Sequence, residues 1–418
     1  MSEEEIRRAG VLKRVKEEEL TQVEAAEMLG VSYRQLKRIY VRYRKAGAAG
    51  LIHASTGKAS NRATPAKQRK RIVGLVRKHY SGAPGERFGP TLAAEHLQED
   101  HGVAVDAETL RRWMLAEGLW TRERKRKPYR QRRERRGHFG ELVQMDGSFE
   151  AWLEDRGPRG CLIHMVDDAT STSLATFAAE ETTWGVADTL RAWVSKYGVP
   201  RALYVDWKTV YHHVPTERQK QEGIVPVSQF GGMCNKLGIE LIGANSPQAK
   251  GRVERGHGTH QDRLIKKMRL KKIDTYEQAN RFLSDGYLAQ HNEKYAVPAR
   301  EPADYHLRWP PRLDAEQVFC LEEERKVSPD WVVQYGSRWL QIERTGQRAR
   351  VLPGNTVTVR QHRDGSLTLL AGRVKLLWHL LPDRPRKPTP LPKRRVATSQ
   401  PPAADHPWRQ RFLAAQPV

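Results

Sequence analysis

Residues 141–270 alternate between short strand patterns and longer helix patterns, and this order limits the possible folds more than any other part of the chain. Apolar, β-branched runs typical of strands lie at 141–145, 159–168, 173–179, 201–206 and 239–242. Helical patterns cover 182–196, 230–237 and 248–270. Three strands followed by alternating helices and strands predict an α/β domain with a mixed five-stranded sheet and helices on both faces.

Three acidic residues occupy distinctive places in this pattern. Asp146 follows Leu-Val-Gln-Met and Asp206 follows Leu-Tyr-Val, so each is expected at the end of a strand, while Glu254 lies early in the helix at 248–270. A single Asp after a strand is more often a turn former. Two acids at strand ends, Asp146 and Asp206, combined with Glu254 in a basic chain, favour a site for hard cations such as Mg²⁺, which prefer carboxylate ligands. Two such ions, about 3.5–4 Å apart, can clamp both oxygens of a phosphoryl displacement.

The helix that carries Glu254 has further features of a substrate-binding face. Lys250 lies four residues before Glu254 and Gly258 four residues after it, so the three are expected on one face. Gly256 and Gly258 are costly inside a helix, and close approach of a substrate backbone would explain them. Lys250, Arg252 and Lys208 are the predicted phosphate contacts beside the carboxylates.

Other candidate ligands are less favoured. Asp167 and Asp168 end the second strand and stay open as alternatives, whereas His212-His213 lack a cysteine or third histidine at metal-site spacing. The three cysteines, Cys161, Cys234 and Cys320, are far apart and form no Cys-x-x-Cys. This spacing argues against a disulfide framework and a cysteine zinc site, and indicates a reducing compartment.

The charge of the chain indicates a polyanionic partner. Its 73 Lys and Arg residues against 49 Asp and Glu give a net charge of +24, which suits a phosphate backbone. Residues 122–136 hold eight arginines and two lysines, including Arg124, Lys125 and Arg126. The segment 121–138 is therefore predicted to be an Arg-rich linker that follows DNA phosphates, with a merely solvated segment as the alternative.

The first 54 residues carry a helix-turn-helix pattern. Thr21 and Glu24 form a capping box, Gly30 ends that helix and Ser32 caps the next one. The second helix of such a unit enters the major groove by its N-terminal residues. The candidate DNA contacts are therefore Tyr33, Arg34, Gln35, Lys37 and Arg38. An ordinary helical hairpin with a solvated basic face is the alternative.

Residues 62–120 predict a second helical unit of the same kind, with helices at 65–80, 90–100 and 106–117. Leu110, Trp113 and Met114 are expected in its core, and Arg111 and Arg112 on its DNA-binding surface. Because the turn before 106 is longer than the standard one, a purely structural three-helix unit stays open.

The chain is too long for one hydrophobic core, so a multidomain protein is expected. A change to period-two patterns predicts a small β-barrel at 322–381, and the Pro-rich basic tail at 382–418 is expected to be disordered. The first residues lack the apolar segment of a signal peptide, and no run reaches the length of a membrane span. These features predict a soluble, cytoplasmic protein that does not associate with membranes.

Three motifs together resemble the Asp-Asp-Glu transposases, which include bacterial insertion-sequence transposases, phage Mu transposase and retroviral integrases. The matching stretches are Gln144-Met145-Asp146-Gly147-Ser148, Tyr204-Val205-Asp206 and Ser246-Pro247-Gln248-Ala249-Lys250-Gly251-Arg252-Val253-Glu254-Arg255. The resemblance implies a ribonuclease-H-like catalytic core at 139–308, in which Asp146, Asp206 and Glu254 are both catalytic residues and ligands of two Mg²⁺ ions, with Mn²⁺ as a substitute. It also makes Asp167 and Asp168 non-ligands.

The same resemblance implies a bacterial transposase that binds the terminal inverted repeats of an insertion sequence, cleaves the strand ends and joins their 3′-hydroxyls to target DNA. Its partners would be double-stranded DNA and further copies of itself, as a homodimer or higher oligomer in a synaptic complex. Trp207-Lys208-Thr209 departs from the Asn-Gly of many relatives, and Tyr211–Gln229 resembles an insertion relative to retroviral integrases. A catalytically silent DNA-binding regulator and a nuclease without strand transfer remain the alternatives.

Overall fold

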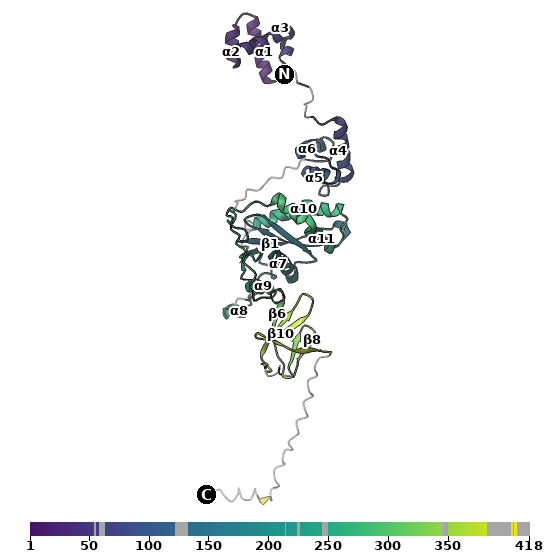
Figure 1. The fold of residues 1–418 in the computed structure, drawn as a ribbon, viewed down its shortest axis with the longest axis vertical. Helices are drawn as coiled ribbons and strands as arrows, with labels where there is room; N and C mark the ends of the chain where they lie inside the picture. Colours follow the sequence, from purple (N-terminus) through teal and green to yellow (C-terminus); the bar gives the residue numbers. More distant parts are fainter. Residues whose placement is uncertain are drawn as a thin grey trace. The chain divides into compact units, whose positions relative to one another are not determined.

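The structure is a computed structural model, and it describes residues 1–53, 56–57, 63–121, 133–213, 215–223, 226–244, 250–344, 346, 350–382, 403 and 405–407. The chain divides into two compact units, Met1–Arg124 and Lys125–Val418. The boundary lies inside the Arg-rich segment that the sequence predicted to be a linker. Figure 1 shows helices alone in the first unit, and a sheet with helices followed by further strands in the second.

The N-terminal helical bundle consists of α1 (Glu3–Lys16), α2 (Gln22–Leu29) and α3 (Tyr33–Ala46). The predicted caps are present: Thr21 and Glu24 form the capping box of α2, and the Ser32 hydroxyl accepts from the backbone of Gln35. Gly30 adopts φ 64° at the end of α2, a conformation that suits glycine. Leu12, Ala25, Leu36 and Ile39 form the core of the bundle.

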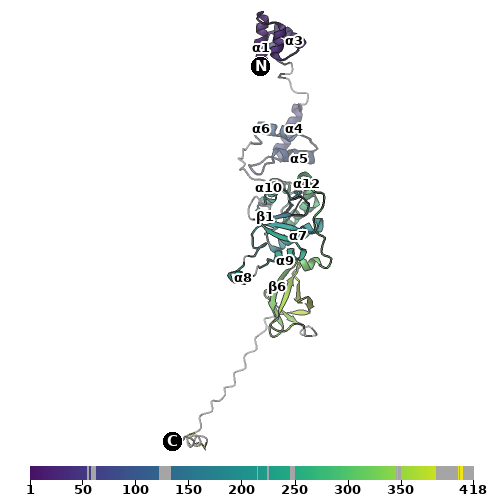
Figure 2. The same ribbon diagram turned by 90° about the vertical axis from the view of Figure 1, so that its left-hand side faces the viewer.

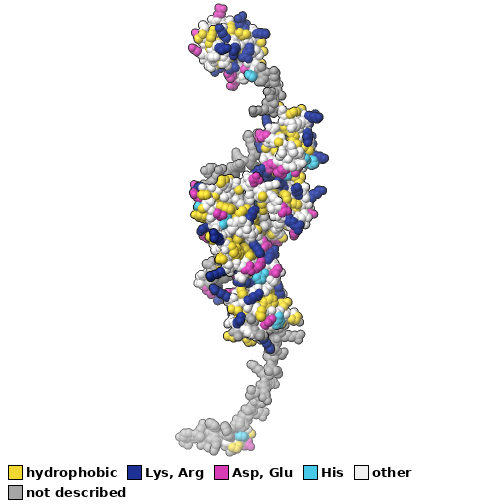
Figure 3. Space-filling view, in the orientation of Figure 1, with side chains coloured by type: hydrophobic (Ala, Val, Ile, Leu, Met, Phe, Trp, Pro, Cys, Tyr) yellow, Lys and Arg dark blue, Asp and Glu magenta, His cyan; other side chains and the backbone are white. Residues whose placement is uncertain are grey.

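The second helical bundle consists of α4 (Ala66–His79), α5 (Pro90–His101) and α6 (Ala107–Ala116). Ile72, Val76, Leu97, Leu110 and Met114 belong to its buried core, while Trp113 is only partly buried against it. In the space-filling view, Lys and Arg side chains are spread over the visible surface of both bundles (Figure 3). The helices agree with the predicted ranges to within about two residues, the usual uncertainty of helix ends.

The central sheet of the second unit has the strand order β3-β2-β1-β4-β5. Its strands are β1 (Val143–Glu150), β2 (Gly160–Asp167), β3 (Ser173–Ala178), β4 (Ala202–Val205) and β5 (Glu240–Gly243). β1, β2 and β3 pair antiparallel, whereas β1 with β4 and β4 with β5 pair parallel. The predicted mixed five-stranded sheet is thus confirmed.

Helices cover both faces of this sheet (Figures 1 and 2). On one face, α7 (Thr183–Tyr197) and α9 (Gln229–Leu237) contribute to an apolar core with Val143 and Met145 of β1. On the other face, α10 (Gly251–Leu270) packs Leu264 and Met268 into a second core. Because side chains alternate along a strand, Gln144 and Asp146 point to the α10 side.

The helix expected beyond 274 is broken into α11 (Tyr276–Phe282), a π-helical segment at Leu283–Tyr287 and α12 (Leu288–Tyr295). Gly286, at φ 160°, interrupts the helical conformation. Two asparagines from these helices satisfy the outer backbone groups of the edge strand β3. Asn280 bonds the N–H and C=O of Phe177, and Asn292 bonds those of Ser173.

The C-terminal strands form two antiparallel sheets with the orders β11-β10-β9-β6 and β12-β8-β7. Val333, Leu340, Val359 and Leu369 belong to their common apolar core. The strands are β6 (Leu321–Lys326), β7 (Val332–Tyr335), β8 (Arg338–Ile342), β9 (Thr356–Gln361), β10 (Leu367–Ala371), β11 (Val374–Leu376) and β12 (Trp378–Leu381). The short helices α8 (Glu217–Gln221) and α13 (Ala315–Val318) and the 3-10 helices Gly47–Leu51 and Glu154–Arg156 complete the described elements. The predicted tail lies outside the described residues, except 382, 403 and 405–407.

Three strand predictions were wrong or incomplete. Asp146 lies within β1 and not at its end, because Gly147 to Glu150 continue the antiparallel ladder with β2. β6 has the charged sequence Leu-Glu-Glu-Glu-Arg-Lys and no period-two apolar pattern. It is a strand because its backbone pairs with β9 along its whole length, and Glu322 forms ion pairs with Arg360 of β9 and with Lys236 of α9. β12 was also not predicted.

Candidate active site

Asp146 and Asp206 lie where two parallel strands separate. β1 pairs with β4 only through Val143 and Gln144, so the β4 side of β1 is open at Asp146. Asp206 follows Val205, the last residue of β4. Both carboxylates therefore reach the same gap beside the carboxyl end of β4, the usual position of binding sites in open sheets.

The ammonium group of Lys250 lies between the two carboxylates. Its Nζ is 3.0 Å from Asp146 Oδ1 and 2.8 Å from Asp206 Oδ1. The Lys250 side chain is only 5% exposed, against 16% for Asp146 and 39% for Asp206. Two of the three acids that the sequence singled out, Asp146 and Asp206, are thus brought to within ion-pair distance of one positive charge.

A second lysine is held beside the pair by an acid that the sequence analysis did not identify. Lys208 Nζ donates to Glu181 Oε2 at 2.7 Å and lies 3.9 Å from Asp146 and 4.0 Å from Asp206. The Tyr211 hydroxyl donates to the other oxygen of Glu181, also at 2.7 Å. The Glu181 side chain is 4% exposed, so it is a buried carboxylate with both oxygens bonded.

These contacts shift proton affinities in the site. Burial raises the pKa of Asp146, but His257 and Lys250 beside it lower the pKa by more, and the net pKa is below its ordinary value. Burial lowers the pKa of Lys208, but Glu181, Asp146 and Asp206 raise it overall above its ordinary value. Both shifts favour the charged forms of Asp146 and Lys208 near neutral pH.

Glu254 lies in the first turn of α10, one turn after Lys250, and is exposed. The start of this helix is fixed by Gln144, whose side-chain oxygen accepts from the backbone N–H of Val253 at 3.1 Å. The preceding residues 245–249, of which 246–249 belong to the third sequence motif, lie outside the described residues. Within the described ranges, no group of three or more His, Cys, Asp or Glu side chains is arranged to hold a metal ion.

Gly256 and Gly258, the two glycines of α10 that were predicted to face substrate, have different surroundings. A Cβ atom at Gly256 would lie 2.4 Å from the His164 ring, so packing against β2 requires this glycine, and its predicted role toward substrate was wrong. A Cβ at Gly258 would meet no atom within 4 Å. Packing therefore does not explain Gly258.

Asp167 and Asp168 are fully buried parts of the fold. Asp167 accepts hydrogen bonds from the backbone of Gly140 and Thr170. Asp168 accepts from Arg252 at 2.7 Å and Gln144 at 2.8 Å, and it also pairs with Arg133. Arg252, predicted to contact DNA, is thus tied to Asp168, and its side chain is 12% exposed. Lys250 is likewise not a surface group.

The predicted DNA contacts of the helical bundles lie at the surface, with one exception. Tyr33, Arg34, Gln35, Lys37 and Arg38 are exposed on α3. On α6, Arg112 is exposed, while Arg111 is half-buried and paired with Glu108. Arg124, Lys125 and Arg126 lie outside the described residues.

The cysteines and the other candidate metal ligands take no part in the site. Cys161, Cys234 and Cys320 are buried and free. His212 lies against Trp207, with ring centroids 4.5 Å apart, and burial lowers its pKa. None of the described helices has the length and apolar character needed to span a bilayer.

Comparison with known proteins places this architecture among the transposases. A helix-turn-helix domain family matches residues 7–59, and a homeodomain-like domain family matches residues 35–114. The transposase y4bF of Sinorhizobium fredii is 36% identical over 92% of this chain and 81% of its own length. The transposase of insertion sequence IS1202 from Streptococcus pneumoniae is 25% identical over 96% of this chain and 92% of its own.

Solved structures of retroviral proteins are similar at a lower level. The HTLV-2 integrase catalytic core domain in complex with magnesium (trimeric form) matches with a TM-score of 0.27 and 17% identity, covering 35% of this chain and 85% of that one. A simian T-cell lymphotropic virus intasome chain matches with a TM-score of 0.31 and 15% identity, over 68% and 94%. The assignment therefore depends on the sequence relatives, and by its identity to y4bF and the coverage of both chains this chain belongs to the transposases.

Proposed function

We propose that this transposase cuts one DNA strand at each end of its element by metal-dependent hydrolysis and then joins the freed 3′-hydroxyl to target DNA. The observation that carries the proposal is the convergence of Asp146 and Asp206, from two different strands, on the Lys250 ammonium at 3.0 and 2.8 Å. In the first step a water oxygen attacks phosphorus and the 3′-oxygen leaves. In the second, that 3′-oxygen attacks a phosphorus of target DNA and displaces another 3′-oxygen.

The donor atoms of the site fit a divalent cation of the Mg²⁺ type. Asp146 and Asp206 supply hard oxygen ligands, and they already hold a positive charge between them in the form of Lys250. Glu254, exposed in the first turn of α10, is the third ligand in this proposal. When bound, two such ions supply Lewis acidity at the phosphoryl oxygens and make the attacking water more acidic. We propose Mg²⁺, with Mn²⁺ as a substitute.

Side chains around the acids then position the DNA. Lys208 is 43% exposed and is held by Glu181, so its ammonium has a fixed place from which a phosphate can be contacted. The exposed residues at the start of α3 read the terminal repeats in the major groove, as the second helix of a helix-turn-helix unit does. Because two element ends must be joined together, the working form is a dimer or a higher oligomer.

The test uses purified full-length protein and duplexes that carry the ends of its own element. With Mg²⁺, we expect cleavage at the 3′ end of the element, and with a pre-cut 3′-hydroxyl donor, joining to a second DNA. Asp206→Asn should abolish both reactions and leave repeat binding intact. Lys266→Gln, on α10 but paired with Asp262, serves as the matched control.

The alternative functions give different results in the same assay. Cleavage without joining of the pre-cut donor would indicate a nuclease and overturn the strand-transfer step. Binding without cleavage, unchanged by Asp206→Asn, would indicate a DNA-binding regulator and overturn the whole proposal.

A further inference from the structure

The flank of α10 opposite the acid pair carries a small cavity rich in arginine. Its volume is about 140 Å³, and its lining includes three arginines, three hydroxyl side chains and two aromatic rings. These residues are Arg135, Arg252, Arg255, Ser171, Ser173, Thr259, His291 and Tyr295. Guanidinium groups beside hydroxyl donors are the chemistry that binds phosphate oxygens.

Positive charge in this cavity is not balanced by the fold. Asp168 pairs with Arg252 and Arg133, but among the described residues Arg135 donates to neutral acceptors alone, the Ala169 carbonyl at 2.8 Å and the Ser171 hydroxyl at 2.9 Å. Within the part of the chain that the structure describes, Arg255 has no ion pair and is exposed. Burial lowers the pKa of Arg252, Asp168 raises it, and Arg133, Arg135 and Arg255 lower it further.

Helical geometry relates this cavity to the acid pair. At 3.6 residues per turn, positions 250, 254, 257 and 261 fall on one flank of α10, the flank of the acids. Positions 252, 255, 256 and 259 fall on the opposite flank, the flank of the arginines. Between them, on the outward ridge, lie Gly251 and Gly258, where an added Cβ would meet nothing within 4 Å.

We propose that the arginine cavity binds a phosphodiester of the DNA strand that is cut, and that this strand crosses the outward ridge of α10 at Gly258. The proposal deepens the proposed function by naming a second phosphate position on the substrate. An α-helix is about 10–12 Å wide with its side chains, so a strand held at the acids reaches the opposite flank within a few nucleotides. Glycines on the ridge, each costing about 1 kcal/mol in a helix, allow the strand to lie close.

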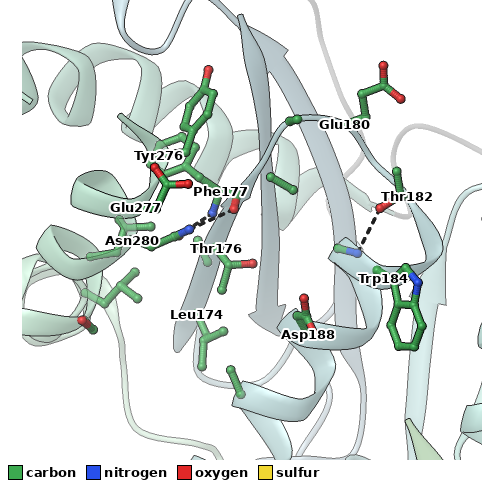
Figure 4. A pocket seen from close by; sticks show the side chains of 18 of the residues that line it. Leu174, Thr176, Phe177, Glu180, Thr182, Trp184, Asp188, Tyr276, Glu277 and Asn280 are labelled. Atoms are coloured by element: carbon green, nitrogen blue, oxygen red, sulfur yellow. Dashed lines mark hydrogen bonds between the residues drawn. The ribbon is translucent and has the colours of Figure 1, made fainter. Parts of the chain in front are cut away.

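A larger cavity of about 960 Å³ beside the edge strand β3 is a poorer phosphate site (Figure 4). Its lining includes three acids, Glu180, Asp188 and Glu277, against Lys196 and Arg363. Arg363 is ion-paired with Asp188 at 3.0 Å, so less positive charge remains for an anion. The excess of arginine over acidic side chains therefore makes the 140 Å³ cavity the better phosphate site, despite its smaller volume.

The test measures DNA binding by fluorescence anisotropy with the full chain, in EDTA, on a duplex of arbitrary sequence at several salt concentrations. Each lost phosphate contact should reduce the slope of log K against log salt by about 0.9. We expect such a reduction for Arg255→Gln and for Arg135→Gln. Arg281→Gln, an exposed arginine on α11, should leave the slope unchanged.

A charge-neutral variant tests the path over the ridge. Gly258→Leu should weaken DNA binding severalfold while the thermal stability is kept or raised, because leucine is the better helix former.

Unchanged salt slopes in both arginine variants, or a reduction in Arg281→Gln of the same size, would overturn the phosphate site. Wild-type affinity in Gly258→Leu would overturn the crossing. Because no metal or cleavage is involved, these outcomes are independent of whether the proposed reaction occurs.

Discussion

Replacing Lys250 with methionine tests whether its ammonium occupies the place of a metal ion. Among the residues that the structure describes, Lys250 Nζ has Asp146 and Asp206 as its ion-pair partners, at 3.0 and 2.8 Å. A divalent cation bound by the same two carboxylates must displace it. Lys250→Met removes this internal competitor and keeps most of the buried side-chain volume, so the variant should bind divalent cations more tightly than the wild type.

The size of the effect follows from the geometry. Two unit charges at 4 Å interact by about 1 kcal/mol in water and about 4 kcal/mol at an effective dielectric constant of 20. Asp206 is 39% exposed and Asp146 16% exposed. The free energy by which the Lys250 ammonium opposes cation binding therefore lies between these limits, at about 1–3 kcal/mol. That free energy corresponds to an affinity about 5 to 150 times higher.

The assay is calorimetric titration of metal-free protein with Mn²⁺, in the absence of DNA. Lys266→Met is the matched control, because Lys266 is a buried lysine on the same helix whose partner, Asp262, lies outside the site. We expect tighter binding only in Lys250→Met. An affinity equal to or below that of the wild type, or equal tightening in both variants, would refute the reasoning. Absence of binding in every protein would instead refute the metal site itself.

Three further predictions concern the supports of the site. Gly256→Ala should destabilise the second unit by about 1–3 kcal/mol, because its Cβ would lie 2.4 Å from the His164 ring. Gly258→Ala should not destabilise it, because a Cβ there meets no atom within 4 Å. Thermal unfolding of the two variants measures this difference. Asp168→Asn should lower the free energy of unfolding by about 1–3 kcal/mol, since it leaves the half-buried Arg252 and the exposed Arg133 without their carboxylate; unchanged denaturant unfolding would contradict this. Burial lowers the pKa of His291 to about 4, so the unfolded chain binds more protons between about pH 6.5 and 4 and stability should fall as pH is lowered through that window. His291→Phe should flatten this dependence, and the exposed control His379→Gln should not.

Much of the site could be predicted because its residues follow local patterns. An apolar run that ends in an acid is visible for Asp206, and the caps Thr21 and Ser32 define the helix-turn-helix unit from the sequence alone. These features depend on neighbours within four residues, where propensity and capping act. Asp146 was found by the same pattern, although its strand continues past it.

The remaining contacts depend on residues far apart in the chain. Glu181 stands just before α7, and no sequence pattern distinguishes it from a solvated acid; only the folded chain brings it to Lys208 and Tyr211. Gly147, beside Asp146, is an indirect indication that another group packs against this strand. A Cβ at position 147 would lie 2.7 Å from the Glu181 carboxyl. Arg135 and Arg255 likewise line one cavity because Asp168, just after β2, binds the backbone of Arg136, and Gln144, on the neighbouring strand β1, binds the backbone of Val253.

The rotation of α10 about its own axis therefore determines where both proposed phosphate positions lie. Gln144 fixes the backbone of Val253, and Gly256 fits against His164, so the helix cannot turn without losing a buried hydrogen bond or creating a clash. One residue inserted between Val253 and Arg255 would rotate the following positions by about 100° and move Arg255 and Thr259 away from the arginine flank. The same insertion among residues 271–275, beyond the end of α10, leaves both flanks in place. We expect the first insertion to abolish the salt-slope contribution of Arg255 and the second to preserve it; equal effects would show that the flanks of α10 do not organise the DNA strand.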